Sequence, residues 1–177
     1  MKEKRLKILT FPLRIALIIL IFGALFKLMH WPYAQQLMLI ASVSISLLYT
    51  IRFFNKTQKQ KLDYIKLALV LVWVFSYLNE VFHLFYFPYI LEVCLFFLFA
   101  WWCIADGFSY FKNRKFKKNK VTKVIYTTLK VVTIVFLVFG MLFKIQHWAY
   151  GSELFVLGVL LLCSVLILDY FIVEQTS

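Results

Sequence analysis

Residues 22–33 read FGALFKLMHWPY and residues 139–150 read FGMLFKIQHWAY, and the two stretches align without a gap. A diverged third copy reads FSYLNEVFH over residues 75–83, and three inserted residues follow before the match resumes. The three histidines of the protein all fall at the same position of the repeat: His30, His83 and His147. Internal repeats of this kind are common in membrane proteins, so the sequence predicts one structural unit used three times.

Each copy of the repeat lies between two apolar runs of membrane-spanning length. A helix of about 20 apolar residues crosses a bilayer, and these runs lack the alternation typical of barrel strands. The predicted fold is therefore an all-α membrane protein with six transmembrane helices in three repeated hairpins. The expected spans are residues 9–30, 33–54, 62–84, 87–111, 124–147 and 149–173. The expected domains are hairpin repeat 1 (1–57), hairpin repeat 2 with a basic cytoplasmic loop (58–120) and hairpin repeat 3 (121–177).

Composition and charge support a polytopic membrane protein. Hydrophobic residues make up 63% and charged residues 16% of the 177 residues, which excludes an ordinary soluble enzyme and a disordered chain. The net charge is +12, but most Lys and Arg lie before the first run and in the second and fourth connections. Positive residues mark cytoplasmic loops, so both termini are expected on the cytoplasmic side of the membrane. Topology accounts for this charge, and no nucleic-acid partner is predicted.

A polar stripe recurs in the three hairpins near the predicted outer boundary. Gly23, Lys27 and His30 are spaced i, i+4 and i+7, which places them on one helical face. A small residue allows close helix approach, so Gly23, Ser76 and Gly140 are predicted helix-packing positions. The predicted polar membrane cluster comprises Lys27, His30, Gln36, Glu80, His83, Glu92, Lys144, His147 and Glu153. The alternative is that these groups only decorate the membrane interface.

The remaining chemistry favours no catalytic site. Phosphate loops, nucleophile elbows and zinc-protease motifs are missing from the sequence, so we predict no enzyme and no cofactor. Three histidines could hold zinc or copper only if the hairpins converge on one point, and we assign no metal. The cysteines lie in apolar runs without a Cys-x-x-Cys pair, and each is expected to behave as a small hydrophobe: Cys94, Cys103 and Cys163.

The Phe-Lys-x-x-His-Trp segments, at residues 26–31 and 143–148, resemble the transmembrane hairpin of GldL. GldL is the membrane motor subunit of gliding motility and type IX secretion in Bacteroidota, and similar segments occur in small membrane proteins of that phylum. The resemblance implies that Lys27, His30, Lys144 and His147 match the first-helix part of a proton-powered hairpin. The second-helix carboxylate of that family has no match in residues 42–49, which contain no acid.

These observations favour a non-catalytic subunit or scaffold of a membrane complex, with the lipid bilayer and other membrane subunits as partners. The alternative is a component of a proton or ion pathway related to the GldL hairpin, because His titrates near neutrality. A membrane enzyme built on the outer His and Glu residues is the least supported of the three hypotheses.

Overall fold

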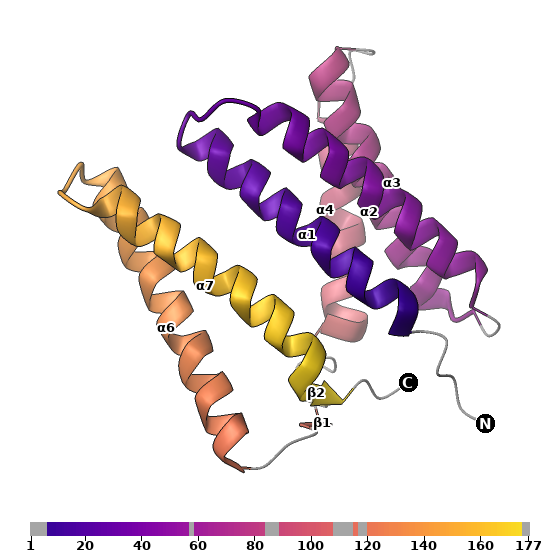
Figure 1. Cartoon of the computed structure of the whole chain (residues 1–177). Helices are drawn as coiled ribbons and strands as arrows, with labels where there is room; N and C mark the ends of the chain where they lie inside the picture. The colour runs from indigo at the N-terminus through magenta and orange to yellow at the C-terminus, as the bar shows by residue number, and fades with distance from the viewer. Residues whose placement is uncertain (1–6, 57–58, 84–88, 108–114, 117–119, 175–177) are drawn as a thin grey trace. The chain divides into compact units, whose positions relative to one another are not determined.

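The structure is a computed structural model that describes residues 7–56, 59–83, 89–107, 115–116 and 120–174 (Figure 1). The described chain is almost entirely helical, because backbone polar groups in lipid must be satisfied within the segment. The elements, in order, are α1 (Lys7–Leu28), α2 (Ala34–Phe54), α3 (Lys61–Phe82), α4 (Ile90–Trp102), the π-helix η2 (Cys103–Gly107), β1 (Lys115–Phe116), α6 (Lys120–Ile145), α7 (Gly151–Ile172) and β2 (Val173–Glu174).

Among the described residues, five helices are long and apolar enough to cross a membrane: α1, α2, α3, α6 and α7. The prediction of an all-α membrane protein is confirmed to this extent. The predicted fourth span forms a shorter apolar helix over Ile90–Ala105. The 13 residues of α4 extend about 20 Å, less than the bilayer core of about 30 Å. Both ends of the predicted span, residues 87–88 and 108–111, lie outside the described part of the chain.

The chain divides into two compact units. The first unit comprises Met1–Ala16 and Leu39–Arg114, and the second comprises Leu17–Met38 and Lys115–Ser177. The first unit contains the antiparallel pair of α3 and α4, and the second contains the pair of α6 and α7 together with the C-terminal half of α1. The residues of the predicted polar cluster are divided between these two units.

Helices α6 and α7 pack closely because glycines, which have no side chain, lie where the two helices meet. A Cβ atom added at Gly140 would lie 2.5 Å from the backbone nitrogen of Phe155, and one at Gly158 would lie 2.9 Å from that of Leu137. At the turn, a Cβ at Gly151 would lie 2.6 Å from the backbone nitrogen of Lys144. The two helix backbones therefore touch along the hairpin, as small residues permit in membrane helices.

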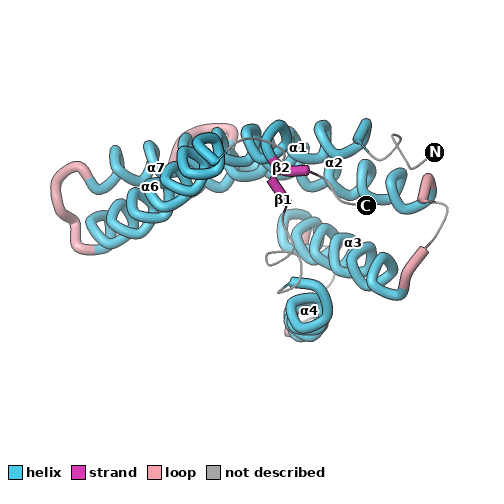
Figure 2. The backbone as a smooth tube through the Cα atoms, turned by 90° about the horizontal axis from the view of Figure 1, so that it is seen from below, coloured by secondary structure: helices cyan, strands magenta, loops and turns pink. Residues whose placement is uncertain are grey.

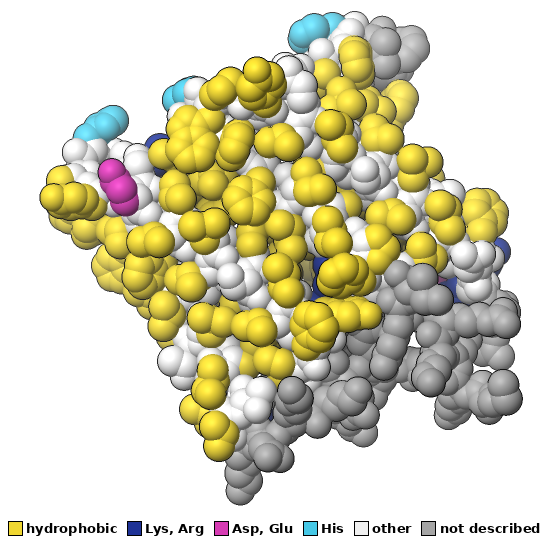
Figure 3. Space-filling model, viewed as in Figure 1, with side chains coloured by type: hydrophobic (Ala, Val, Ile, Leu, Met, Phe, Trp, Pro, Cys, Tyr) yellow, Lys and Arg dark blue, Asp and Glu magenta, His cyan; other side chains and the backbone are white. Residues whose placement is uncertain are grey.

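The second unit has one apolar core cluster between α1 and α7 and another between α6 and α7. The first of them is built on three residues. Leu25, Val159 and Cys163 are buried there, and partly buried side chains from α1, α7 and the neighbouring α6 surround them. Many large apolar side chains remain on the surface, for example Phe96 and Ile104, which are 68% and 80% exposed. The visible face in Figure 3 is correspondingly dominated by hydrophobic side chains. Lipid tails can cover such a surface, so little internal core is required.

Two short strands, β1 and β2, pair at the end of the α6–α7 hairpin opposite to its turn. Lys115 pairs with Glu174 and Phe116 with Val173 in an antiparallel ladder, drawn in magenta in Figure 2. The rest of the predicted basic loop between α4 and α6, residues 108–114 and 117–119, lies outside the described residues. The ladder joins the chain just before α6 to the chain just after α7.

Candidate functional site

The tips of the hairpins share an unusual backbone. Within the described residues, positive φ angles outside glycine occur at six positions, two in each hairpin. The first set is the three repeat histidines, with φ of 55°, 49° and 55° at His30, His83 and His147. The second set is the three tyrosines before the return helices, with φ of 66°, 62° and 63° at Tyr33, Tyr89 and Tyr150. Side chains with a Cβ rarely adopt this conformation, so its recurrence at matching positions sets the hairpin tips apart.

In the first hairpin the histidine ends α1 through a Schellman cap. The His30 backbone N–H donates to the carbonyl of Lys27 at 3.3 Å, and the Trp31 N–H donates to that of Phe26 at 2.9 Å. This pair of bonds, with a left-handed residue between them, satisfies the last free carbonyls of a helix. The position usually belongs to glycine, and histidine is among the other residues that tolerate it.

The third hairpin repeats this cap almost identically. The His147 N–H donates to the carbonyl of Lys144 at 3.2 Å, and the Trp148 N–H donates to that of Phe143 at 2.9 Å. A Schellman cap is often accompanied by an apolar contact between its first and last residues. Here the Phe143 and Trp148 rings meet edge to face with centroids 5.0 Å apart, and those of Phe26 and Trp31 are 5.1 Å apart.

The Phe-Lys-x-x-His-Trp motif therefore has a direct structural meaning. Phe and Trp form the apolar contact of the cap, His takes the left-handed position, and Lys supplies a bonded carbonyl. In the second hairpin His83 ends α3 in the same conformation, with ψ of 40°, although Asn79 stands in place of the Phe. Each helix ends one or two residues before its histidine, so the imidazoles do not continue the helical stripe expected from the spacing.

The tyrosines complete the tips by starting the return helices. The Tyr33 carbonyl accepts from the Leu37 N–H at 3.1 Å, that of Tyr89 from Val93 at 2.9 Å, and that of Tyr150 from Leu154 at 3.0 Å. The three tyrosines are 70–75% exposed. In the first and third hairpins the chain thus reverses between two left-handed residues, His and Tyr. In the second hairpin His83 and Tyr89 are left-handed too, and residues 84–88 between them lie outside the described part of the chain.

Lys144 is the predicted cluster residue that joins two hairpins. Its Nζ donates to the carbonyl oxygen of Leu28 at 2.7 Å and lies 3.5 Å from the sulfur of Met29, at the C-terminal end of α1. The same ammonium lies 6.0 Å from the ring centroid of Phe155. A cation is favourable beside helix C-terminal carbonyls, which carry partial negative charge. Lys144 therefore ties α6 to the end of α1 within the second unit.

The other predicted residues are not joined to one another in the described part of the chain. Ser76 is half-buried, while Gly23 and Gly140 are buried where their helices contact the return helix. No ion pair or side-chain hydrogen bond links the predicted lysines, histidines and acids among the residues described, and those residues contain no group of three potential metal ligands. Figure 3 shows the imidazoles in cyan at the hairpin tips. The exposed members are Lys27, His30, Gln36, Glu80, His83, Glu92, His147 and Glu153.

The third hairpin contains a buried polar pair that was not predicted from the sequence. Tyr126 of α6 is 1% exposed, and its hydroxyl donates to the Asp169 carboxylate of α7, which is 6% exposed. The Lys130 ammonium lies 4.3 Å from the Tyr126 ring centroid. The 43 residues between Tyr126 and Asp169 leave no local signal for this pairing. Their positions, seven residues into α6 and three before the end of α7, are the only hint that the sequence offers.

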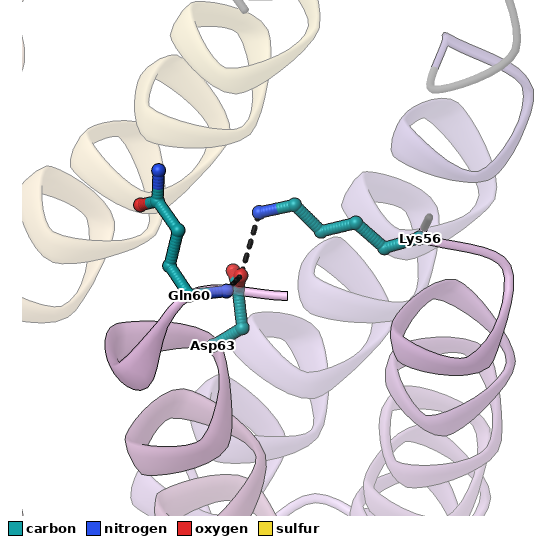
Figure 4. Close-up of polar contacts among 3 residues, drawn as sticks. All are labelled: Lys56, Gln60 and Asp63. Carbon is teal, nitrogen blue, oxygen red and sulfur yellow. Dashed lines mark hydrogen bonds and ion pairs between the residues drawn. The ribbon is translucent and has the colours of Figure 1, made fainter. Parts of the chain in front are cut away.

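An acidic residue at the start of α3 bonds to both sides of the connection between α2 and α3. The Asp63 carboxylate accepts from Lys56 Nζ at 2.6 Å and from the Gln60 backbone N–H at 2.8 Å (Figure 4). Gln60 and Asp63 form a capping box at the start of α3. A carboxylate in the first helical turn is stabilised by the free N–H groups and the helix dipole. This contact belongs to the start of α3 rather than to the hairpin tips.

We expect Lys144→Met to destabilise the protein, whereas Lys27→Met does not. The two lysines occupy the same repeat position, but the Lys144 ammonium is bonded to the end of α1 while the Lys27 side chain is exposed. Loss of the hydrogen bond from the Lys144 ammonium to the Leu28 carbonyl should lower the free energy of unfolding by about 1–2 kcal/mol. This value is at the low end for a charged hydrogen bond, because water reaches the site. Thermal midpoints of the detergent-solubilised variants measure the difference. Equal midpoints for the two variants would contradict the role assigned to Lys144.

The fold and the hairpin tips define a class: a multi-pass α-helical membrane protein whose first and third hairpins turn back through short tips with Schellman caps. Residues 15–69 match the GldL N-terminal domain family, so the resemblance to GldL is confirmed for this part of the chain. The match begins within α1, includes the first hairpin tip and ends within α3. No curated protein and no solved structure matches the chain.

Proposed function

We propose that the protein is a non-catalytic subunit or scaffold of a membrane complex of the gliding-motility and type IX secretion kind. The match to the GldL N-terminal domain carries this proposal, since GldL is itself a membrane component of such machinery. The Schellman caps of the first and third hairpins add support, because they give these two hairpins a well-defined end that a partner can recognise. The same resemblance supports the proposal of a bacterial inner-membrane location and a Bacteroidota source.

The proposed architecture is three hairpin repeats with six membrane crossings and both termini in the cytoplasm. Paired left-handed His and Tyr residues in all three tips support the repeat, with units at 1–57, 58–120 and 121–177. The fourth crossing is assigned to α4 continued by η2. Cysteine-labelling in inverted and right-side-out vesicles tests the topology. The proposal expects labels beside Tyr33, Tyr89 and Tyr150 to react only from the periplasmic side.

The subunit role is tested by purification of the tagged protein in a mild detergent from the cells that express it naturally. We expect a membrane protein to copurify in a fixed ratio with the wild type. The matched variants are Lys27→Met and Glu153→Gln, whose exposed side chains lie near the tips and have no polar contact with the described residues. We expect one or both to lose the partner at an unchanged thermal midpoint. A wild-type protein recovered alone, with unaltered tips, would contradict the proposal.

A proton or ion pathway is the second candidate, and the buried Tyr126–Asp169 pair favours it. Ionisable side chains inside membrane helices commonly mark such pathways. The polar pair does not by itself cross the bilayer, since the α6–α7 contact beyond it is formed by Leu137, Gly140 and Gly158. Proteoliposomes carrying a pH-sensitive dye test the pathway. Proton flux above that of empty vesicles, abolished by Asp169→Asn and retained by Asp63→Asn, would favour it over the scaffold.

A further inference from the structure

A shallow groove runs between α3 and α4 in the first unit. Its volume is about 380 Å³, and its lining consists of Leu69 and Trp73 from α3 and of Glu92, Leu95, Phe96 and Phe99 from α4. All of these side chains but one are apolar. The groove faces outward, since Phe96 and Phe99 are 68% and 54% exposed. Among the described residues, its lining is therefore that of an apolar groove with one carboxylate.

The carboxylate belongs to the lining residue nearest the start of α4. Glu92 is in the first turn of α4, close to the tip that contains His83 and Tyr89. Its side chain is exposed, and no hydrogen bond or ion pair joins it to residues 59–83 or 89–107. Phe96 and Phe99 follow at i+4 and i+7, so they share its helical face and extend about 10 Å from it toward the middle of the helix.

This arrangement matches the shape and charge of one kind of molecule. A negative charge near the tip suits a cationic headgroup, and an aromatic wall leading inward suits an acyl chain. An α-helix is about 10–12 Å across with its side chains, which is too wide for a hollow between two adjacent packed helices. An anionic headgroup would be repelled by Glu92, whereas an ammonium would be attracted to it.

We propose that the α3–α4 groove binds a phospholipid with a primary ammonium headgroup, of the phosphatidylethanolamine type. The ammonium pairs with Glu92, and one acyl chain lies along Trp73, Phe96 and Phe99. The ion pair is exposed, so it favours this lipid over phosphatidylglycerol by about 2- to 5-fold. The site depends on the α3–α4 pair lying in a bilayer and is independent of the subunit role proposed above.

Trp73 provides an internal reporter of the occupant. The test uses full-length protein in which the other tryptophans are replaced by phenylalanine: Trp31, Trp101, Trp102 and Trp148. Vesicles contain equal amounts of phosphatidylethanolamine and phosphatidylglycerol, and bromine atoms on the acyl chains of one lipid at a time quench the fluorescence of a neighbouring indole. We expect brominated phosphatidylethanolamine to quench Trp73 more strongly than brominated phosphatidylglycerol.

Two matched proteins make the comparison specific. Glu92→Gln in the same background keeps the groove and removes the charge, so the two brominated lipids should then quench Trp73 equally. The second control retains Trp101 as the only tryptophan. Trp101 is 64% exposed and lies on α4, the helix that carries Glu92, so it should show no lipid preference with or without Glu92. Thermal midpoints within a few degrees of the wild type establish that the variants are folded.

Each other outcome overturns the proposal. Equal quenching of Trp73 by both lipids in the protein with Glu92 means that the groove has no headgroup preference. A preference that persists in Glu92→Gln means that the carboxylate does not select the lipid. Weak quenching of Trp73 by either lipid, with strong quenching of Trp101, means that protein, such as a second copy of the chain, covers the groove.

Discussion

Gly140→Ala is expected to lower the thermal midpoint of the detergent-solubilised protein strongly. The added methyl group would lie 2.5 Å from the backbone nitrogen and 2.6 Å from the Cα of Phe155. Backbone atoms cannot rotate away as a side chain does, so α6 and α7 must separate. Overpacking of this kind costs about 2–3 kcal/mol. The loss should be greatest in the third hairpin, where the two helices have their closest contact.

Gly23→Ala is the matched control, because Gly23 occupies the same repeat position in the first hairpin. Its added methyl group would lie 2.7 Å from Cγ of Met38, which belongs to a flexible side chain, and 3.0 Å from the Met38 backbone nitrogen. Rotation of Met38 relieves the closer of these two contacts. We therefore expect a smaller loss of stability than for Gly140→Ala. A larger loss at Gly23 would contradict the backbone contact assigned to Gly140.

Tyr126→Phe is expected to destabilise the α6–α7 pair by removing the hydroxyl that donates to Asp169. A buried carboxylate that loses a hydrogen-bond donor incurs a desolvation cost of about 1–3 kcal/mol. The ring is retained, so the apolar contacts with Val165 and Ile172 remain. Chemical unfolding monitored by helical circular dichroism measures the change in the free energy of unfolding.

Tyr150→Phe is the control for this substitution. Tyr150 belongs to the same hairpin, but its side chain is 75% exposed, so its hydroxyl can bond to water in either state. We expect the free energy of unfolding to stay within about 0.5 kcal/mol of the wild type, as for most surface changes. An equal loss in Tyr126→Phe and Tyr150→Phe would show that the buried hydrogen bond does not stabilise the hairpin.

The helices were predictable from sequence because a membrane allows few alternatives. Apolar runs of sufficient length placed α1, α2, α3, α6 and α7 within a few residues of their observed bounds. The fourth span was less predictable, because the apolar run over residues 87–111 includes Asp106 and Gly107, where the helix becomes a π-helix. Hydrophobicity alone does not report such a change in helical hydrogen bonding.

The hairpin tips were only partly predictable. The spacing of Lys27 and His30 suggested a common helical face, but the chain leaves the helix at Leu28. A stronger signal was the five-residue separation of Phe26 and Trp31, which is the distance between the first and last residues of a Schellman cap. The Lys144 bond to Leu28 could not be predicted, because it depends on the packing of helices 116 residues apart in sequence.

The central claim is that the repeated histidines serve as left-handed residues at helix ends. The most direct test compares double substitutions of His30 and His147 to glycine and to valine. Glycine adopts positive φ freely, whereas a β-branched side chain is strongly disfavoured there, at a cost of about 1–2 kcal/mol per position. We predict a thermal midpoint near that of the wild type for the double glycine protein and a much lower one for the double valine protein. Equal losses in the two proteins would show that the imidazoles themselves, rather than the backbone conformation, are what the hairpins require.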